Sequence, residues 1–225
     1  MFSLGGIRRA LQPLVLKYWL NQRSQKTVTT RVEGFELLVF PSVFHPRYFG
    51  SSAILARFVS SLGMKGKSFL DLGCGSGLIA LCAARAGARV TAADINPEAV
   101  RCTSSNAARH NVPIDAKVSN LFSSLDDARF DVIAWNPPFL PGVAKTTADA
   151  AFYGGPRFDV IRRFVAGVRS HLNPEAEIYT ILSTDVDLAY VENFFREQEF
   201  TVSRALSKRW GLGETMVILR ASIRR

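Results

Sequence analysis

The sequence predicts a doubly wound α/β fold with a mostly parallel seven-stranded sheet that ends in an antiparallel hairpin. From Lys67 onward, short β-rich runs alternate with helical patterns, which is typical of a parallel sheet with helices on both faces. A glycine-rich turn follows the first of these runs directly. The last two runs are joined through Gly211-Leu212-Gly213, a connection short enough to require an antiparallel pair.

An N-terminal extension, residues 1–50, precedes the main domain of residues 51–225. Within it, residues 4–20 place apolar side chains at three- and four-residue spacing among basic residues. This spacing predicts an amphipathic helix, or a pair of short helices divided near Pro13.

A β-hairpin is expected next in the extension. The runs 27–32 and 35–40 are rich in β-branched and aromatic residues, and Glu33-Gly34 joins them. Two such runs joined by two residues that end in glycine are a strong hairpin signal. Residues 43–50 then form an aromatic-rich loop that leads into the main domain.

The main domain reads as seven strands and five helices. Each of its first five strands is separated from the next by a helical pattern or a long connection, so we expect these strands to be parallel. The expected strands are 68–72, 89–95, 116–121, 130–135, 177–182, 200–206 and 215–221, and the expected helices are 51–62, 77–86, 96–109, 157–172 and 186–197.

Composition places the chain among cytoplasmic globular proteins. Its 225 residues, 48% of them hydrophobic, suffice for one well-buried domain and a modest extension. The first 20 residues lack a cleavage site and are interrupted by Pro13 and Lys17, so neither a signal peptide nor a membrane span is expected. Three cysteines without metal-ligand spacing predict reduced thiols and no metal site: Cys74, Cys82 and Cys102.

The net charge of +9 is concentrated at the two ends of the chain. Residues 1–34 and residues 204–225 each hold six Lys/Arg against one acid, whereas residues 35–203 hold 16 basic and 17 acidic side chains. Basic ends around a neutral centre favour a polyanionic partner such as RNA, DNA or a ribosomal particle. The alternative is that these charges only keep the ends soluble.

The glycine-rich turn indicates a ligand site at the end of the first main-domain strand. Gly73, Gly75 and Gly77 follow the run 68–72 and precede a helical pattern. Glycines at these positions allow a tight turn and let ligand atoms approach the backbone closely. The alternative is a glycine turn without a ligand.

Two carboxylates extend this pattern toward a nucleoside. Asp94 closes the second strand, 21 residues after Gly73, where a carboxylate can accept hydrogen bonds from both hydroxyls of a ribose. A dinucleotide fingerprint would have glycine at position 78, where this chain has Leu78. It would also give no reason for Asp71, whose carboxylate can face a cationic group of a different ligand. The alternative role for Asp94 is that of a helix cap.

A second site is expected where the apolar run 130–135 ends in Asn136-Pro137-Pro138-Phe139. Neither proline has an N–H, so this turn offers only acceptors. The Asn136 amide oxygen and the Pro137 carbonyl can accept from the two N–H groups of a planar amine, and the Phe139 ring can stack on it. The alternative is that the prolines only terminate a strand.

These segments together resemble the class I S-adenosylmethionine-dependent methyltransferases of the "small domain" group. Residues 71–77 are similar to the first motif of that Rossmann-like fold, 94–97 to its second, and 136–139 to its Asn-Pro-Pro-aromatic pattern. The resemblance implies S-adenosylmethionine as cofactor, bound by the motif residues with Asn136 at the border with the acceptor. It also implies that Ile95 packs on the adenine and that the amide oxygen of Asn120 accepts from the adenine amine.

The group contains release-factor glutamine, adenine-N6 and rRNA guanine-N2 methyltransferases, and the sequence leaves the acceptor open among them. Residues 151–155 and 159–164 look most like the glutamine/adenine branch, whereas Phe139 is more familiar in guanine-N2 enzymes. The leading hypothesis is N-methylation of a planar NH2 group, with RNA, a ribosomal particle or a translation factor met by the basic termini. The alternatives are a small-molecule N-methyltransferase, with the hairpin as a lid, and a non-catalytic binding module.

Overall fold

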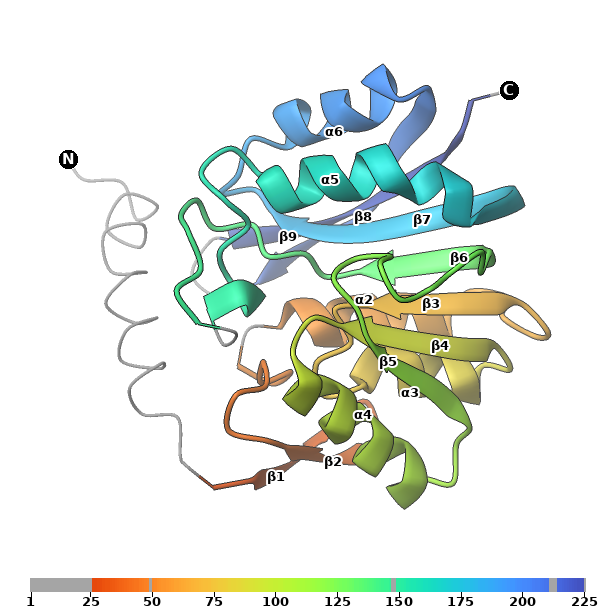
Figure 1. The fold of residues 1–225 in the computed structure, drawn as a ribbon, viewed down its shortest axis with the longest axis vertical. Coiled ribbons are helices and arrows are strands. Elements are labelled where there is room, and N and C mark those ends of the chain that lie inside the picture. The colour runs from red at the N-terminus through yellow and green to blue at the C-terminus, as the bar shows by residue number, and fades with distance from the viewer. Residues whose placement is uncertain (1–25, 49, 147–148, 211–213, 225) are drawn as a thin grey trace.

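A seven-stranded sheet with helices packed on both faces forms the centre of the computed structural model (Figure 1). The structure describes residues 26–48, 50–146, 149–210 and 214–224. The strands of the sheet are β3 Ser68–Leu72, β4 Arg89–Asp94, β5 Ile114–Val118, β6 Phe130–Trp135, β7 Leu172–Ser183, β8 Phe200–Trp210 and β9 Glu214–Ile223.

The strand order is β5-β4-β3-β6-β7-β9-β8. The five strands from β5 to β7 are mutually parallel, and β9 pairs antiparallel with both β7 and β8. The predicted doubly wound architecture is therefore confirmed. Because β3 lies between β4 and β6 and is parallel to both, the carboxyl ends of these three strands lie side by side at one edge of the sheet.

The helices divide between the two faces of the sheet. They are α2 Ser51–Ser60, α3 Leu78–Arg85, α4 Pro97–Arg109, α5 Asp159–Gly167 and α6 Leu188–Glu197, with short 3-10 turns η1 Asp149–Ala151 and η2 Val168–His171. One hydrophobic cluster lies under α2 and α3, around Leu55 and Leu81. A second lies under α5 and α6, around Phe164 and Phe195. Burial of this kind is the main source of the fold's stability.

One expected strand is misplaced in a way that affects the site. The prediction of a strand over 116–121 is wrong at its end, because β5 stops at Val118. Ser119 then donates its N–H to the Asp94 carbonyl, and its hydroxyl bonds to the Leu121 carbonyl at 2.8 Å. Asn120 consequently lies in a turn beyond the strand and not at its last position.

The expected N-terminal hairpin is present as β1 Val28–Val32 and β2 Phe35–Val39. Its turn residues Glu33 and Gly34 have φ values of 49° and 82°, as a two-residue hairpin turn with positive φ at both positions requires. Phe35 and Leu37 belong to the cluster under α2 and α3, so the hairpin shares a core with the main domain. The helix predicted over 4–20 lies outside the described residues.

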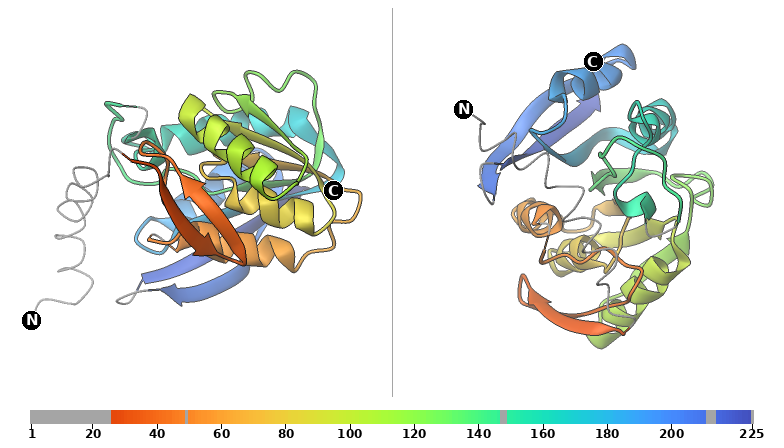
Figure 2. Two further views of the ribbon diagram at one scale, coloured as in Figure 1. Left: turned by 90° about the horizontal axis from the view of Figure 1, so that it is seen from below. Right: turned by 90° about the vertical axis from the view of Figure 1, so that its left-hand side faces the viewer.

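The hairpin lies along α4 (Figure 2). Asn106 of α4 is fully buried and bonds to both backbone groups of Leu38, while Glu36 pairs with Arg109 at the end of the same helix. On the other side, Glu33 pairs with Arg57 of α2 at 2.6 Å. The hairpin is thus joined to two helices of the main domain.

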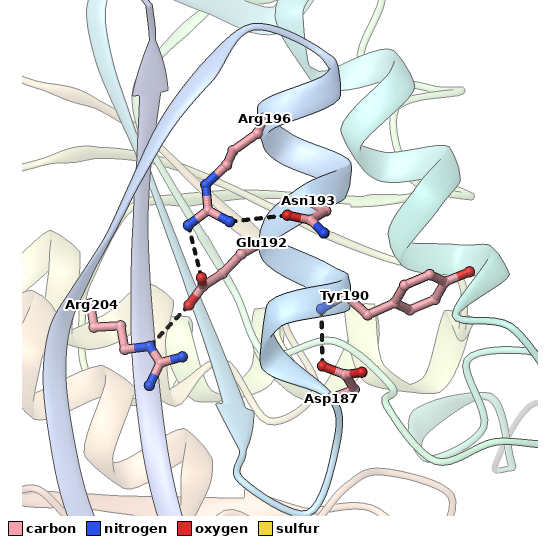
Figure 3. Close-up of polar contacts among 6 residues, drawn as sticks. All are labelled: Asp187, Tyr190, Glu192, Asn193, Arg196 and Arg204. Atoms are coloured by element: carbon pink, nitrogen blue, oxygen red, sulfur yellow. Dashed lines mark hydrogen bonds and ion pairs between the residues drawn. The ribbon is translucent and has the colours of Figure 1, made fainter.

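A charged cluster joins α6 to the edge strand β8 (Figure 3). Glu192 accepts from Arg196 on the same helix and from Arg204 on β8, each at 2.9 Å. Burial opposes the charge of Glu192, but the hydrogen bonds from the two arginines outweigh it and lower the pKa of the carboxyl. Asp187 caps the start of α6 by accepting the Tyr190 N–H at 3.0 Å.

Membrane-spanning helices and metal-binding groups were searched for in the described part of the chain. There, no helix is both long and apolar enough to cross a membrane. No group of three or more His, Cys, Asp or Glu side chains in the same part could hold a metal ion. All three cysteines are buried free thiols.

Candidate active site

A cavity of about 300 Å³ opens at the edge where β3, β4 and β6 end. Its wall includes Gly73 and Gly75 from the loop after β3, Asp94 and Ile95 from the end of β4, and Asn136 after β6. The sequence predictions placed these five residues at separate points along the chain, and the parallel sheet brings them together. This edge is the usual position of ligands in open α/β sheets.

The glycine-rich loop is held tightly against β4. The N–H groups of Gly73 and Cys74 both donate to the Ala93 carbonyl, at 2.7 and 3.1 Å. Gly73, Gly75 and Gly77 all have positive φ, between 53° and 80°, a conformation that side chains disfavour. A Cβ atom at Gly75 would have no neighbour nearer than 4.0 Å, so the cavity has open space beside this backbone. Such a cradle fits a ligand that approaches the main chain closely.

Asp94 both shapes the loop and lines the cavity. Its carboxylate accepts from the Gly75 N–H at 3.0 Å and from the Asn96 N–H at 2.9 Å. Burial raises the pKa of Asp94, although these N–H bonds act in the opposite direction. Ile95 beside it keeps 46% of its surface exposed. The hydrogen-bond acceptor Asp94 therefore lies next to an exposed apolar side chain, as expected of residues that bind a ribose and an adenine. The N-cap of α4 is Asn96 and not Asp94.

The structure does not bring Asp71 into the cavity wall. Its side chain is fully buried behind the loop, where Oδ2 accepts the Ala80 N–H of α3 at 2.9 Å. Oδ1 has no hydrogen-bond partner among the described residues. Burial raises the pKa of Asp71 to about 8, and the nearby Asp94 charge adds to the effect. An unpartnered buried carboxyl oxygen beside the loop fits a cationic ligand there, but through the electric field and not through the expected direct contact.

Asn136 lies in the cavity wall with its amide held from behind. Its Nδ2 donates to Ser51 Oγ and to Ser52 Oγ, each at 3.1 Å. No described residue donates to Oδ1, which is the atom that was expected to accept from the methyl acceptor. The two serines, at the start of α2, were not identified from the sequence, because they are 84 and 85 residues away from Asn136.

Pro137 and Phe139 do not line the cavity. In the extended chain after β6 successive side chains alternate in direction, and Asn136 and Pro138 are the ones in the wall. Phe139 packs instead against the cluster under α5 and α6, so the expected stacking of its ring on the acceptor is not provided in this structure.

Other aromatic rings occupy the wall where Phe139 was expected. Phe44 of the aromatic-rich loop, Trp135 at the end of β6 and Tyr153 line the cavity. Phe44 also packs on Phe152, with ring centroids 5.4 Å apart. The sequence indicated both segments as aromatic-rich or family-like, but it could not indicate which rings face inward.

The segment that carries Tyr153 folds back on the segment after Asn136. Leu140 donates its N–H to the Phe152 carbonyl at 2.9 Å, and Gly154 donates to the Leu140 carbonyl at 3.0 Å. A Cβ atom at Gly154 would come within 2.3 Å of the Pro138 carbonyl oxygen. Only glycine allows this approach, which explains one of the two glycines of the Gly154-Gly155 pair.

Asn120 lines the cavity from the turn beyond β5. Its Oδ1, the atom expected to accept from adenine, accepts from Arg163 Nη2 of α5 at 3.1 Å. Arg163 is a further wall residue that the sequence did not indicate. Cys74 lies in the wall as well, but burial raises the pKa of its thiol well above the ordinary value, which disfavours the thiolate that a nucleophile would need.

Comparison with known proteins finds methyltransferases, in agreement with the resemblance of the sequence motifs. A family model of the methyltransferase small domain matches residues 41–205. A putative protein N5-glutamine methyltransferase of Methanocaldococcus jannaschii is 33% identical over 159 residues, which cover 68% of this chain and 78% of that protein. A ribosomal RNA small subunit methyltransferase C of Alcanivorax borkumensis is 30% identical over 160 residues, covering 70% of this chain and 45% of the relative.

Among solved structures, a 16S rRNA N2 methyltransferase of T. thermophilus in complex with AdoMet and guanosine has the same fold. It superimposes with a TM-score of 0.66 at 22% identity, over 88% of this chain and 50% of that one. The chain thus spans most of the glutamine methyltransferase relative, but only about half of the length of the two rRNA methyltransferases.

Proposed function

The chain belongs to the methyltransferase small domain family, and we propose that it methylates a planar NH2 group, foremost the side-chain amide of a protein glutamine. The enzyme uses S-adenosylmethionine as methyl donor. The observation that supports the proposal most directly is the orientation of Asn136, whose Oδ1 is left for an N–H donor in the wall of the cavity that holds the motif residues.

Four wall residues hold the cofactor in this proposal. Gly73 and Gly75 give its amino-acid part access to the backbone, Asp94 accepts from the ribose hydroxyls, and Ile95 packs on the adenine. When bound, S-adenosylmethionine supplies a methyl group activated by the sulfonium sulfur. The buried carboxyl of Asp71 favours positive charge in this part of the cavity.

Asn136 has the central role on the acceptor side. The lone pair of an amide or exocyclic NH2 is delocalised into its π-system and is a weak nucleophile. A hydrogen bond from this group to Asn136 Oδ1 favours a more pyramidal nitrogen and stabilises the positive charge that grows on it during methyl transfer. The expected second acceptor, the Pro137 carbonyl, belongs to a buried residue outside the wall, so Asn136 carries this role in the proposal.

Alignment, not strong base catalysis, accounts for the rate in this mechanism. Phe44, Trp135 and Tyr153 confine the planar group, and the same rings exclude water from it. Direct transfer to the acceptor nitrogen needs no covalent enzyme intermediate, and burial, which raises the pKa of the Cys74 thiol, disfavours this side chain as a nucleophile.

Protein glutamine is placed first because this chain covers 78% of the putative protein N5-glutamine methyltransferase but only 45% of the ribosomal RNA methyltransferase C relative. The residue pattern 151–155 and 159–164 also resembles the glutamine/adenine branch. A nucleobase amine in RNA is the second candidate, favoured by the six Lys/Arg at each end of the chain.

The test is transfer of a tritiated methyl group from S-adenosylmethionine into cell extract separated into protein, RNA, DNA and metabolite fractions. We expect label in protein, recovered as N5-methylglutamine after complete proteolytic digestion and as methylamine after acid hydrolysis. Asn136→Ala should keep cofactor binding in calorimetry while losing most of the transfer. Label only in RNA would select the second candidate, label only in metabolites would support a small-molecule enzyme, and full activity of Asn136→Ala would refute the mechanism.

A further inference from the structure

The first turn of α2 contains two hydroxyls that form hydrogen bonds with the Asn136 side-chain amide. Both hydrogens of the NH2 group have an acceptor, Ser51 Oγ and Ser52 Oγ, at 3.1 Å each. The two serines are nearly inaccessible, with 3% and 9% of their surfaces exposed, so little water competes for these bonds. Neither hydroxyl caps the helix, which begins after Gly50 without a side-chain cap.

These bonds place the NH2 end of the amide at the serines and leave Oδ1 without a donor among the described residues. A rotation of 180° about the last side-chain bond would exchange oxygen and nitrogen at almost no steric cost. The exchanged amide would point two N–H donors toward the place of a sulfonium cation and offer the acceptor no oxygen. In the observed orientation both N–H groups have a serine oxygen as acceptor and only Oδ1 is left for a ligand donor, whereas the exchanged amide would need both serine hydroxyls to donate to Oδ1.

From this we infer that Ser51 and Ser52 are positioning residues that lock Asn136 Oδ1 toward the methyl acceptor and thereby restrict the site to N–H donors. The inference rests on the proposed function. It extends that function to the helix that precedes the glycine-rich loop, where no motif residue lies. A methyl-accepting group without an N–H would place its lone pairs against those of Asn136 Oδ1, and this repulsion would disfavour its binding.

The serines are themselves fixed by packing around Gly50. This residue has a φ of 68°, and a Cβ atom there would lie 2.2 Å from the ring of Trp210 at the end of β8. The start of α2 therefore packs against the end of β8, the edge strand of the sheet. Rigid support behind a catalytic amide is what alignment of a weak nucleophile requires.

The first test needs no acceptor. In protein labelled with 15N-asparagine, the NH2 signal of Asn136 is identified by its loss in Asn136→Ala. We expect its hydrogens to exchange slowly in the wild type, and at least about tenfold faster in the double variant Ser51→Ala/Ser52→Ala. Exchange in the wild type as fast as that of exposed Asn193 would overturn the inference, since the NH2 would then not face the serines.

The second test is turnover with tritiated S-adenosylmethionine and the extract fraction that the wild type labels. We expect kcat to fall about tenfold in each single serine-to-alanine variant and about a hundredfold in the double variant, with cofactor affinity within twofold. Ser51→Thr, which keeps a hydroxyl, should recover most of the activity. Ser60→Ala is the matched control, because its hydroxyl lies at the other end of α2, where it bonds to the Ala56 carbonyl at 3.0 Å and to the Cys82 thiol of α3.

The two proposals fail in different ways. An unchanged kcat in the double variant, with an active wild type, would refute the role of the serines and leave the proposed function intact. A wild type that labels no fraction would refute the proposed function, while the exchange experiment would still decide whether the serines hold the amide.

Discussion

Asn106 on α4 pairs with Leu38 on the hairpin as a neighbouring strand would. Its Oδ1 accepts the Leu38 N–H and its Nδ2 donates to the Leu38 carbonyl, both at 2.8 Å. Nδ2 also donates to the Ser76 carbonyl of the glycine-rich loop at 2.9 Å. One buried side chain thus joins the hairpin, α4 and the loop that walls the cavity.

Replacing this amide should be costly. Asn106→Ala leaves the Leu38 N–H without a partner and the Leu38 carbonyl with only the weak Cys102 thiol donor, so we expect the free energy of unfolding in urea to fall by about 3 kcal/mol. Asn193→Ala, at an exposed position of α6, should change it by less than about 0.5 kcal/mol. Equal small effects at both sites would show that the hairpin contributes nothing to stability through Asn106.

Asp94→Asn should weaken cofactor binding. The carboxylate accepts two backbone N–H groups, and an amide of the same size must turn its NH2 toward one of them. We expect the dissociation constant for S-adenosylmethionine in calorimetry to rise about 10- to 100-fold. Asp115→Asn, the same change on the neighbouring strand β5 at an exposed side chain, is the control and should leave it unaltered.

Cofactor affinity should depend on pH through Asp71. The pKa of this carboxyl is raised to about 8 in the free protein, so it is protonated at pH 7. A cation in the cavity favours the ionised form and lowers this pKa, so binding releases a proton. Affinity should therefore rise with pH, by at most about tenfold per unit, and level off above pH 8, where Asp71 is already ionised.

Calorimetry at pH 7 in buffers of different ionisation enthalpy measures this proton release directly. Asp71→Asn cannot ionise, so its binding should release less proton and its affinity should change less with pH. Proton release equal to that of the wild type would assign the effect to another group, such as Asp94, whose pKa burial also raises.

Gly154→Ala should damage the acceptor side and spare the cofactor side. The added methyl group would lie 2.3 Å from the Pro138 carbonyl oxygen and displace the segment after Asn136. We expect turnover to fall about tenfold or more with cofactor affinity unchanged. Gly63→Ala, where no atom lies within 4 Å of the new carbon, is the control and should behave as the wild type.

If the acceptor sits in RNA or a ribosomal particle, binding should weaken steeply with salt. β8 is parallel to β7, so its last residues, the exposed Lys208 and Arg209, lie at the cavity edge of the sheet. Replacing both with Gln should reduce the slope of log affinity against log salt by about two. Deleting residues 1–26, which hold five Lys/Arg, should also reduce the slope. The same change at Lys65 and Arg89, exposed at the opposite edge, should leave the slope unchanged.

The sheet and the cofactor side of the cavity could be predicted because local signals coincide there. Periodicity fixed β3 and β6 to the residue, and the glycine turn and Asp94 directly follow strands whose ends must meet. The Asp71 prediction was less accurate for a geometric reason. The family motif gives its position in the chain, but burial behind α3 depends on how that helix packs.

The acceptor side could not be predicted to the same extent. The direction of Phe139 depends on the alternation of an irregular segment, and the rings that replace it come from Phe44 and Tyr153, far apart in the sequence. Ser51 and Ser52 carry no motif. Their role comes only from the tertiary contact with Asn136, which no pattern in either segment indicates.

The position of Asn106 also has a kinetic consequence for the cofactor. Val43 and Phe44 of the cavity wall follow the hairpin directly, and Asn96 holds the Ser42 carbonyl at 3.0 Å. Partial opening of residues 26–48 would remove that wall without unfolding the sheet. The release rate of the bound cofactor product should then follow the hydrogen-exchange rate of β1 and β2, strands that do not touch the cofactor at all.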